Sequence, residues 1–167
     1  MSKLEVREIG PISGETEVRL ADGATAVGFG GGKLLQVVQG VYSTQLVTTS
    51  ETYVTSELKA SITPSSTSSK ILVIAKVTAF YNSGGGGDET GGAMALFRDG
   101  ANILDRCGAS YSANNGTSID AGVYFLDAPS STSSLNYEIY FKKEYGDNQF
   151  CHAGNTPSQI ILMEVAG

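Results

Sequence analysis

KILVIAKVTAFY, residues 70–81, is the stretch that decides the fold of this chain. It is rich in β-branched side chains and contains neither glycine nor proline, so it predicts a long β-strand. Its wholly apolar part, from Ile71 to Ala75, is far shorter than the roughly 20 residues that a membrane-spanning helix needs. We therefore expect a strand of a sheet and no insertion into a membrane.

Short alternating or wholly apolar runs recur on both sides of this stretch, whereas long runs with helical periodicity do not. Turn signals such as Asp99-Gly100 and Gly146-Asp147-Asn148 separate them. This spacing of about eight to ten strands predicts an all-β, two-sheet antiparallel sandwich. The further strands are expected at 34–43, 45–48, 53–58, 93–98, 102–108, 109–111, 119–126, 135–144 and 159–165.

The composition agrees with an all-β domain and excludes some partners. The 167 residues include 21 glycines and no tryptophan, and only 17% of them are charged. The formal net charge of −6 has the wrong sign for holding a phosphate backbone, so we expect no nucleic acid partner. Residues 1–5 lack the apolar core of a signal peptide, which predicts synthesis and folding in a cytoplasm.

Residues 1–32 differ from the rest of the chain. They contain two or three strand-sized pieces, too few for an independent sheet, and end in the glycine-rich run 28–32. The pieces either pack on the body or pair with other copies or another protein. We favour the second, because a flexible hinge would serve no purpose for a strand fixed within its own domain. The sequence thus predicts an attachment and trimerisation segment at 1–32 and a sandwich domain at 33–167.

The hexapeptide PSSTSS occurs twice, at 64–69 and at 129–134, each time before a long strand. We interpret the copies as equivalent turns that carry the chain from one sheet to the other. Their hydroxyl groups can satisfy exposed loop backbone. A degenerate gene duplication, which would give two superposable halves, is the alternative.

Several fragments carry a family resemblance that covers roughly residues 33–166. They occur in register and together resemble a module common in tail-fibre and other virion appendage proteins of phages, especially marine and cyanobacterial ones. The resemblance implies a homotrimeric jelly roll displayed on the virion surface. The fragments are KLLQVVQ (33–39), SITPSSTSSKILV (61–73), ALFRDG (95–100), FLDAP (125–129), YEIY (137–140) and IILMEV (160–165).

The function that this resemblance implies is that of a phage virion structural protein, a trimeric tail-fibre or appendage module for host attachment. A capsid-decorating protein is the alternative, and an enzyme acting on host glycans is a third possibility. Docking onto other virion proteins is assigned to the apolar residues of the first segment, Leu4, Val6, Ile9, Ile12, Val18 and Leu20. The host receptor, a surface glycan or a protein, is left open.

Two loops carry the candidate ligand contacts. Tyr81 lies at the rim of the glycine-rich loop that contains Asp88 and Glu89, and Tyr111 lies close to Asn115 in a second turn. Amphipathic tyrosine rings serve both carbohydrate stacking and protein interfaces. The glycine-rich loop lacks the Lys-Ser/Thr of a phosphate cradle. A calcium site at Asp88, Glu89 and Thr90 remains an alternative, since oxygen ligands are present without EF-hand spacing.

The cysteines and the single histidine suggest no catalysis. Cys151 and His152 are neighbours in the sequence, and successive side chains along a strand point to opposite faces, so they should not pair as nucleophile and base. With Cys107 they supply three zinc ligands where a structural site needs four, unless copies of His152 meet on a trimer axis. We expect both thiols to be reduced, with a bridge between two strands as the alternative.

The carboxylates Asp99, Asp105, Asp120 and Asp127 are the residues from which a glycoside-cleaving pair would have to come. Asp99 lies in a turn and Asp127 precedes the Ala128-Pro129 turn, so we expect neither to be enclosed. We therefore expect no catalytic residues, no metal site, no cofactor and no enzymatic activity.

Overall fold

The computed structural model describes residues 33–83, 89–113 and 116–167. Asp88, Asn115 and the whole of the first segment, with its six docking residues and its hinge, lie outside the described residues. The boundary between the attachment segment and the sandwich therefore stays a prediction.

The described residues form ten strands and one short 3₁₀ turn, η1 (Ala153–Asn155), and contain no α-helix. The all-β prediction is confirmed. The strands are β1 (Leu34–Tyr42), β2 (Leu46–Thr48), β3 (Val54–Ile62), β4 (Lys70–Ser83), β5 (Thr90–Arg98), β6 (Ala101–Ser112), β7 (Ser118–Asp127), β8 (Leu135–Tyr145), β9 (Asn148–Cys151) and β10 (Ser158–Val165).

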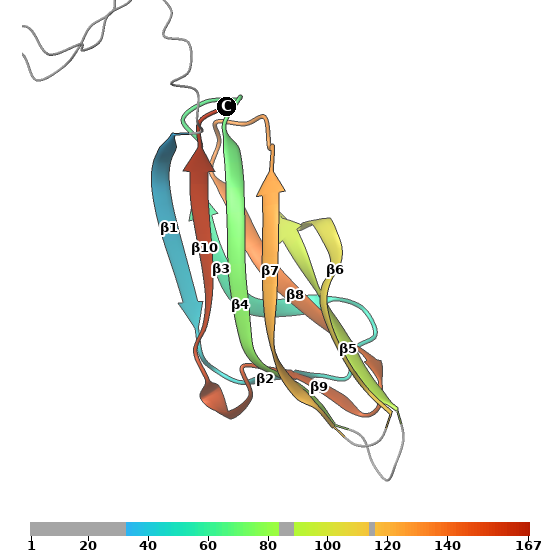
Figure 1. Cartoon of the computed structure of the whole chain (residues 1–167). Helices are drawn as coiled ribbons and strands as arrows, with labels where there is room; N and C mark the ends of the chain where they lie inside the picture. The colour runs from blue at the N-terminus through green and yellow to red at the C-terminus, as the bar shows by residue number, and fades with distance from the viewer. Residues whose placement is uncertain (1–32, 84–88, 114–115) are drawn as a thin grey trace, which may run out of the picture. The chain divides into compact units, whose positions relative to one another are not determined.

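Two antiparallel sheets pack face to face (Figure 1). In the first sheet, β4 pairs with β10 and β7 on its two sides, and β1 follows β10 at the margin. The end of β4 also pairs with β9, which carries β2. The second sheet has the order β3-β8-β5-β6. The orders β1-β10-β4-β7 and β3-β8-β5-β6, reached by repeated crossing between the sheets, define a jelly roll.

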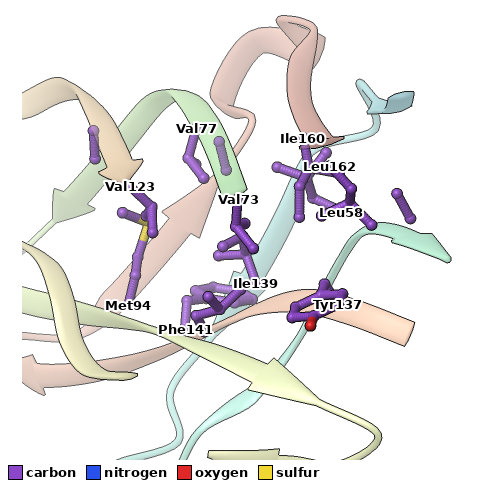
Figure 2. Close-up of a cluster of buried hydrophobic side chains, with 14 of the residues drawn as sticks. Leu58, Val73, Val77, Met94, Val123, Tyr137, Ile139, Phe141, Ile160 and Leu162 are labelled. Atoms are coloured by element: carbon purple, nitrogen blue, oxygen red, sulfur yellow. The ribbon is translucent and has the colours of Figure 1, made fainter. Parts of the chain in front are cut away.

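The core lies between the two sheets and is made mainly by the inward-facing residues of β3, β4, β5, β7, β8 and β10 (Figure 2). In β8, the predicted inward row of Leu135, Tyr137, Ile139 and Phe141 is buried as expected. From the first sheet, β4 contributes its odd-numbered residues from 71 to 77. Burial of such side chains stabilises each by about 1.5–3 kcal/mol relative to exposure, and this holds the sheets together.

The two PSSTSS loops have the role that was predicted for them. The first connects β3 of the second sheet to β4 of the first sheet, and the second connects β7 of the first to β8 of the second. Their hydroxyls accept from local backbone, since Ser68 N donates to Ser66 Oγ at 3.2 Å and Ser133 N donates to Ser131 Oγ at 3.0 Å. The prediction of two equivalent crossing turns is confirmed.

Three strand predictions need correction. β3 continues through Ala60 to Ile62, and β6 is one strand where two were expected. β9 was not among the expected strands, and its first residue, Asn148, was expected in a turn. It becomes a strand because the end of the long β4 offers it a partner, with Asn82 opposite Gln149.

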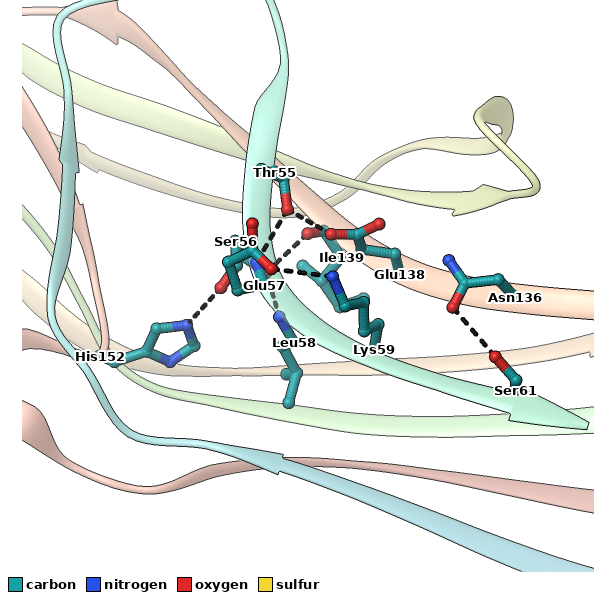
Figure 3. A network of polar contacts seen from close by, with 10 residues as sticks. All are labelled: Thr55, Ser56, Glu57, Leu58, Lys59, Ser61, Asn136, Glu138, Ile139 and His152. Carbon is teal, nitrogen blue, oxygen red and sulfur yellow. Dashed lines mark hydrogen bonds and ion pairs between the residues drawn. The ribbon is translucent and has the colours of Figure 1, made fainter.

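A bulge in β3 is fixed by a buried polar network (Figure 3). The register of β3 against β8 shifts between Thr55 and Lys59, and Glu57 within the bulge has a positive φ of 59°. The Ser56 hydroxyl donates to Ile139 O at 2.5 Å, and the Ser56 carbonyl lies 3.1 Å from His152 Nε2. These bonds satisfy the polar groups that the bulge removes from the sheet.

Candidate functional site

The two ends of the sandwich differ in what they carry. Residue 33 lies where β1 begins, opposite the end of β10, since Ala166 N donates to Lys33 O at 2.9 Å. β4, β6 and β8 end at the other end of the sandwich, and β5, β7 and β9 begin there, as Figure 1 shows. We call this second end the loop end.

Asn82 ties together the strands from which the loops leave. It is fully buried, and its Nδ2 donates to Ser110 Oγ at 2.9 Å. Its Oδ1 accepts from Thr90 Oγ1 at 2.6 Å and from Thr117 N at 2.9 Å. A satisfied buried amide of this kind rigidifies the scaffold at the base of the loops.

Two tyrosines and a carboxylate meet on the surface of the loop end. The Tyr111 hydroxyl donates to Glu89 Oε1 at 2.9 Å, and this bond raises the pKa of Tyr111. The Tyr111 ring stands edge-on to the Tyr145 ring, with centroids 6.1 Å apart. Both rings are about half exposed, at 56% and 50%. Gly91 lies between them, and a Cβ there would come within 3.1 Å of the Tyr145 ring.

A shallow hollow of about 280 Å³ adjoins this tyrosine pair and shares Tyr145 with it. Ion pairs join residues of its lining, with Lys143 Nζ 3.2 Å from Glu51 Oε1 and Lys142 Nζ 3.2 Å from Glu144 Oε1. The hollow is lined by Glu51, Lys142, Lys143, Glu144 and Tyr145. We refer to these five residues together with Glu89 and Tyr111 as the loop-end site.

An aromatic cluster continues the loop-end site along the outer face of the second sheet. Phe97 stacks on Tyr140 with centroids 4.0 Å apart, and Tyr53 meets Phe97 edge-on at 6.0 Å. Lys142 Nζ lies 4.9 Å from the Tyr53 ring centre, in cation–π geometry. Burial, together with the nearby Asp105 carboxylate, raises the pKa of Tyr53 to about 12. Charged groups and flat aromatic surface thus lie side by side on this face.

The structure brings some of the predicted contact residues together and separates others. Tyr111 and Glu89 are hydrogen-bonded. Tyr81 lies elsewhere, on β4, where its ring packs against Phe150 at 5.4 Å. Tyr145 and the charged residues of β8 were missed, although the run Lys142-Lys143-Glu144, which interrupts the apolar alternation, is a signal that could have found them.

One of the three residues considered as calcium ligands, Thr90, is buried in the interior. The Thr90 side chain is fully buried and its hydroxyl donates to Asn82. The Glu89 carboxylate accepts from Tyr111. Across residues 33–83, 89–113 and 116–167, no three His, Cys, Asp or Glu side chains gather where they could hold a metal ion.

His152 and Cys151 are both buried, which corrects the expectation that one of them would face outward. His152 lies just beyond β9, and its left-handed φ of 55° turns its side chain into the core. It contacts the ring of Tyr42 at 5.2 Å. A fully buried imidazole is not available for a metal on a trimer axis, so that alternative is wrong for this structure.

Both thiols are free. Burial raises the pKa of Cys107 to about 12 and raises that of Cys151 well above its usual value. Neither sulfur is therefore a thiolate at neutral pH, and neither has the activation that a nucleophilic cysteine requires.

The carboxylates considered for glycoside cleavage are engaged with scaffold groups. Asp127 pairs with Arg98 Nη1 at 2.5 Å and accepts from the Tyr137 hydroxyl at 2.6 Å. Asp120 pairs with Lys76 Nζ at 2.9 Å. Asp99 accepts from Asn136 N at 2.8 Å. Each of these three carboxylates fixes a turn or a strand.

No protein-family model matches the chain, and no curated protein matches it. Among solved structures, the infectious bursal disease virus VP2 subviral particle aligns with 79% of this chain and 37% of that chain, at 15% identity and a TM-score of 0.35. The structure of infectious bursal disease virus Gt strain aligns with 79% of this chain and 38% of that chain, at 17% identity and a TM-score of 0.36.

The chain spans less than two fifths of the length of these structural neighbours. Their TM-scores are too low to support a functional argument, so the jelly-roll assignment stands on the strand order. Among the described residues, the structure has no helix with the length and apolar character to cross a membrane.

Proposed function

We propose that this protein is a structural protein of a phage virion, a homotrimeric tail-fibre or appendage module on the virion surface that attaches the particle to its host. Residues 1–32 dock onto other virion proteins, and the loop-end site contacts a host surface glycan or protein. The role is one of binding and requires neither a cofactor nor a catalytic group.

The observation that carries this proposal is that the candidate site and the start of the sandwich lie at opposite ends of the jelly roll. Residue 33, through which the first segment joins the sandwich, lies at one end of the strands. Tyr111 and Tyr145 lie at the ends of β6 and β8, and Glu89 lies just before β5, which places all three at the opposite end of these strands (Figure 1). An attachment module needs this arrangement, because a site beside its own anchor would be covered by the particle.

The sequence resemblance supports the same proposal. Its fragments fall on the scaffold: they coincide with β1, with the β3–β4 connection, with the β5–β6 hairpin, and with parts of β7, β8 and β10. The loops of the loop end are not among them. A shared scaffold with individual loops is expected where related appendages recognise different hosts, since function lies in sites grafted onto a fold.

Capsid decoration is the alternative location for the same module. Gold-labelled antibodies against the full chain, applied to particles purified from cells that carry its gene, separate the two. Label at the tail supports host attachment, whereas label on the head replaces it with decoration. Particles that carry no label would overturn the virion proposal altogether.

A further inference from the structure

The outer face of the first sheet is apolar where solvent would call for polar side chains. An antiparallel sheet with one solvated face alternates apolar and polar residues. In β4, Leu72 and Ile74 point away from the core, and in β10, Ile161 and Met163 do so. The resulting unbroken apolar runs are typical of strands that are covered on both faces.

The register of the sheet aligns these residues into two rows that cross four strands, from β1 through β10 and β4 to β7. One row contains only apolar side chains, and the other contains one glutamine. The rows are Val37, Met163, Leu72 and Leu126, and Gln39, Ile161, Ile74 and Tyr124. We call these eight residues the apolar patch.

The apolar patch is open at both margins of the sheet. Tyr124 is 75% exposed, Val37 53% and Leu126 52%. With its half-covered central residues and the neighbouring Leu35 and Val41, this face exposes on the order of 600 Å² of apolar surface, the upper end for the largest patch on a monomer. Two such faces approach the roughly 1,200 Å² at which stable, standard-size interfaces begin.

On one border of the apolar patch, the charge is already paired. The next row across the sheet contains Gln159 and Lys76, and Lys76 Nζ is bound by Asp120 Oδ2 at 2.9 Å. A partner that covers the patch therefore does not have to desolvate an unpaired Lys76 ammonium group at this border. A partner surface that is itself flat and apolar fits it, with a polar rim of the kind that interfaces have.

We propose that the apolar patch is the surface through which copies of this chain pack against each other. The four strands span about 15 Å from first to last axis, wider than a single extended segment covers. The exposed side chains at both margins, Val37 on β1 and Tyr124 on β7, leave the full width of this face free for the contact. This inference rests on the self-association in the proposed function and specifies its surface.

The test compares two exposed tyrosines on opposite sheets, Tyr124 and Tyr111. Full-length wild type, Tyr124→Lys and Tyr111→Lys are studied by sedimentation over a hundredfold range of concentration. Tyr124→Ala, which introduces no charge, serves as a milder second variant. A thermal unfolding curve for each protein shows whether the fold is kept. We expect wild type and Tyr111→Lys to sediment as oligomers and Tyr124→Lys to dissociate with an apparent constant raised at least tenfold.

Each other result is informative about a different part of the proposal. Oligomers that persist unchanged in both folded Tyr124 variants would overturn the apolar patch as the interface while leaving self-association intact. A wild type that stays monomeric at every concentration would overturn the inference and the homotrimer together. A dimer that depends on Tyr124 would support the patch and contradict only the trimer.

Discussion

His152 Nδ1 lies 2.6 Å from Ser158 Oγ, and both side chains are buried. The other ring nitrogen, Nε2, faces the Ser56 carbonyl at 3.1 Å, and a carbonyl can only accept. Nε2 therefore carries the proton, and Nδ1 accepts from the Ser158 hydroxyl. Ser158 Oγ in turn accepts from Thr78 N at 2.9 Å. A neutral imidazole thus links β3 to β10 and β4 through the core.

This neutral imidazole predicts a loss of stability in mild acid. Burial lowers the pKa of His152 below its ordinary value of 6.5. The unfolded chain then binds the proton more readily than the folded one, so the free energy of unfolding falls as the pH drops below about 6.5. Urea unfolding at about pH 7.5 and about pH 5.5 measures this decrease.

The His152→Asn variant should be less stable at pH 7.5 by about 1–3 kcal/mol, because buried polar partners lose their bonds. Asparagine tolerates the left-handed backbone at this position. Its stability should change less between the two pH values than that of wild type. An equal change in both proteins would contradict a role for His152.

Glu164 predicts a second loss of stability at lower pH. Its carboxylate accepts from Ser65 N at 2.7 Å, from Ser65 Oγ at 2.6 Å and from Gln36 Nε2 at 2.6 Å. Burial opposes ionisation, but these bonds outweigh it and lower the pKa from 4.5 to about 2. Stability that is present above about pH 4.5 is therefore lost as the pH falls toward 2.

Glu164→Gln tests this carboxylate because an amide has one acceptor oxygen where the site offers three donors. We expect a loss of about 1–3 kcal/mol at neutral pH and a flatter stability curve between about pH 4.5 and 2.5. Glu57→Gln, at an exposed pair with Lys59, is the matched control and should change little. A Glu164 variant with the acid profile of wild type would disprove the assignment.

Gly40 lies where the two sheets approach each other too closely to leave room for any side chain. A Cβ at this position of β1 would lie 2.0 Å from the backbone oxygen of Lys59 in β3. Because a backbone atom cannot swing aside, Gly40→Ala should destabilise the fold by about 1–3 kcal/mol or more. In the control Gly122→Ala, the new Cβ would lie 3.3 Å from the exposed Tyr124 ring, which can move. Thermal unfolding should separate the two, and equal melting temperatures would contradict the predicted contact.

The two thiols should be inert in the folded protein. Burial raises the pKa of Cys107 to about 12 and that of Cys151 well above normal, so the thiolate is scarce and shielded. At about pH 8, a disulfide reagent such as DTNB should label neither thiol in the time that suffices for both in guanidinium. Rapid labelling of one equivalent, lost in Cys107→Ser, would show that the half-buried Cys107 is accessible.

The sequence predicts the strands well because each is a local pattern. The alternation of Leu135, Tyr137, Ile139 and Phe141 places them correctly in the core. The strand β9 cannot be found in this way, since its pairing depends on the far end of β4. The same holds for the loop-end site.

The loop-end site depends on pairings between distant parts of the chain. Tyr111 and Tyr145 become neighbours because each lies opposite Gly91, the first through β6 and the second through β8. Thirty-odd residues separate them in sequence. A pattern within one strand carries no information on that register, so only Tyr111 and Glu89 of this site were predicted.

The loop-end site itself is tested by its tyrosines. Loss of an aromatic platform weakens stacking contacts, so Tyr111→Ala and Tyr145→Ala should each reduce binding of the full chain to host cells by about fivefold or more. Both side chains are half exposed, and we expect melting temperatures near that of wild type. Fluorescently labelled protein and flow cytometry measure the binding. Tyr124→Ala, on the opposite sheet, is the control. It shows how much binding is lost when the oligomer dissociates and avidity falls, without a change in the loop-end site. Cells that bind wild type and the two loop-end variants equally would place recognition elsewhere on the molecule.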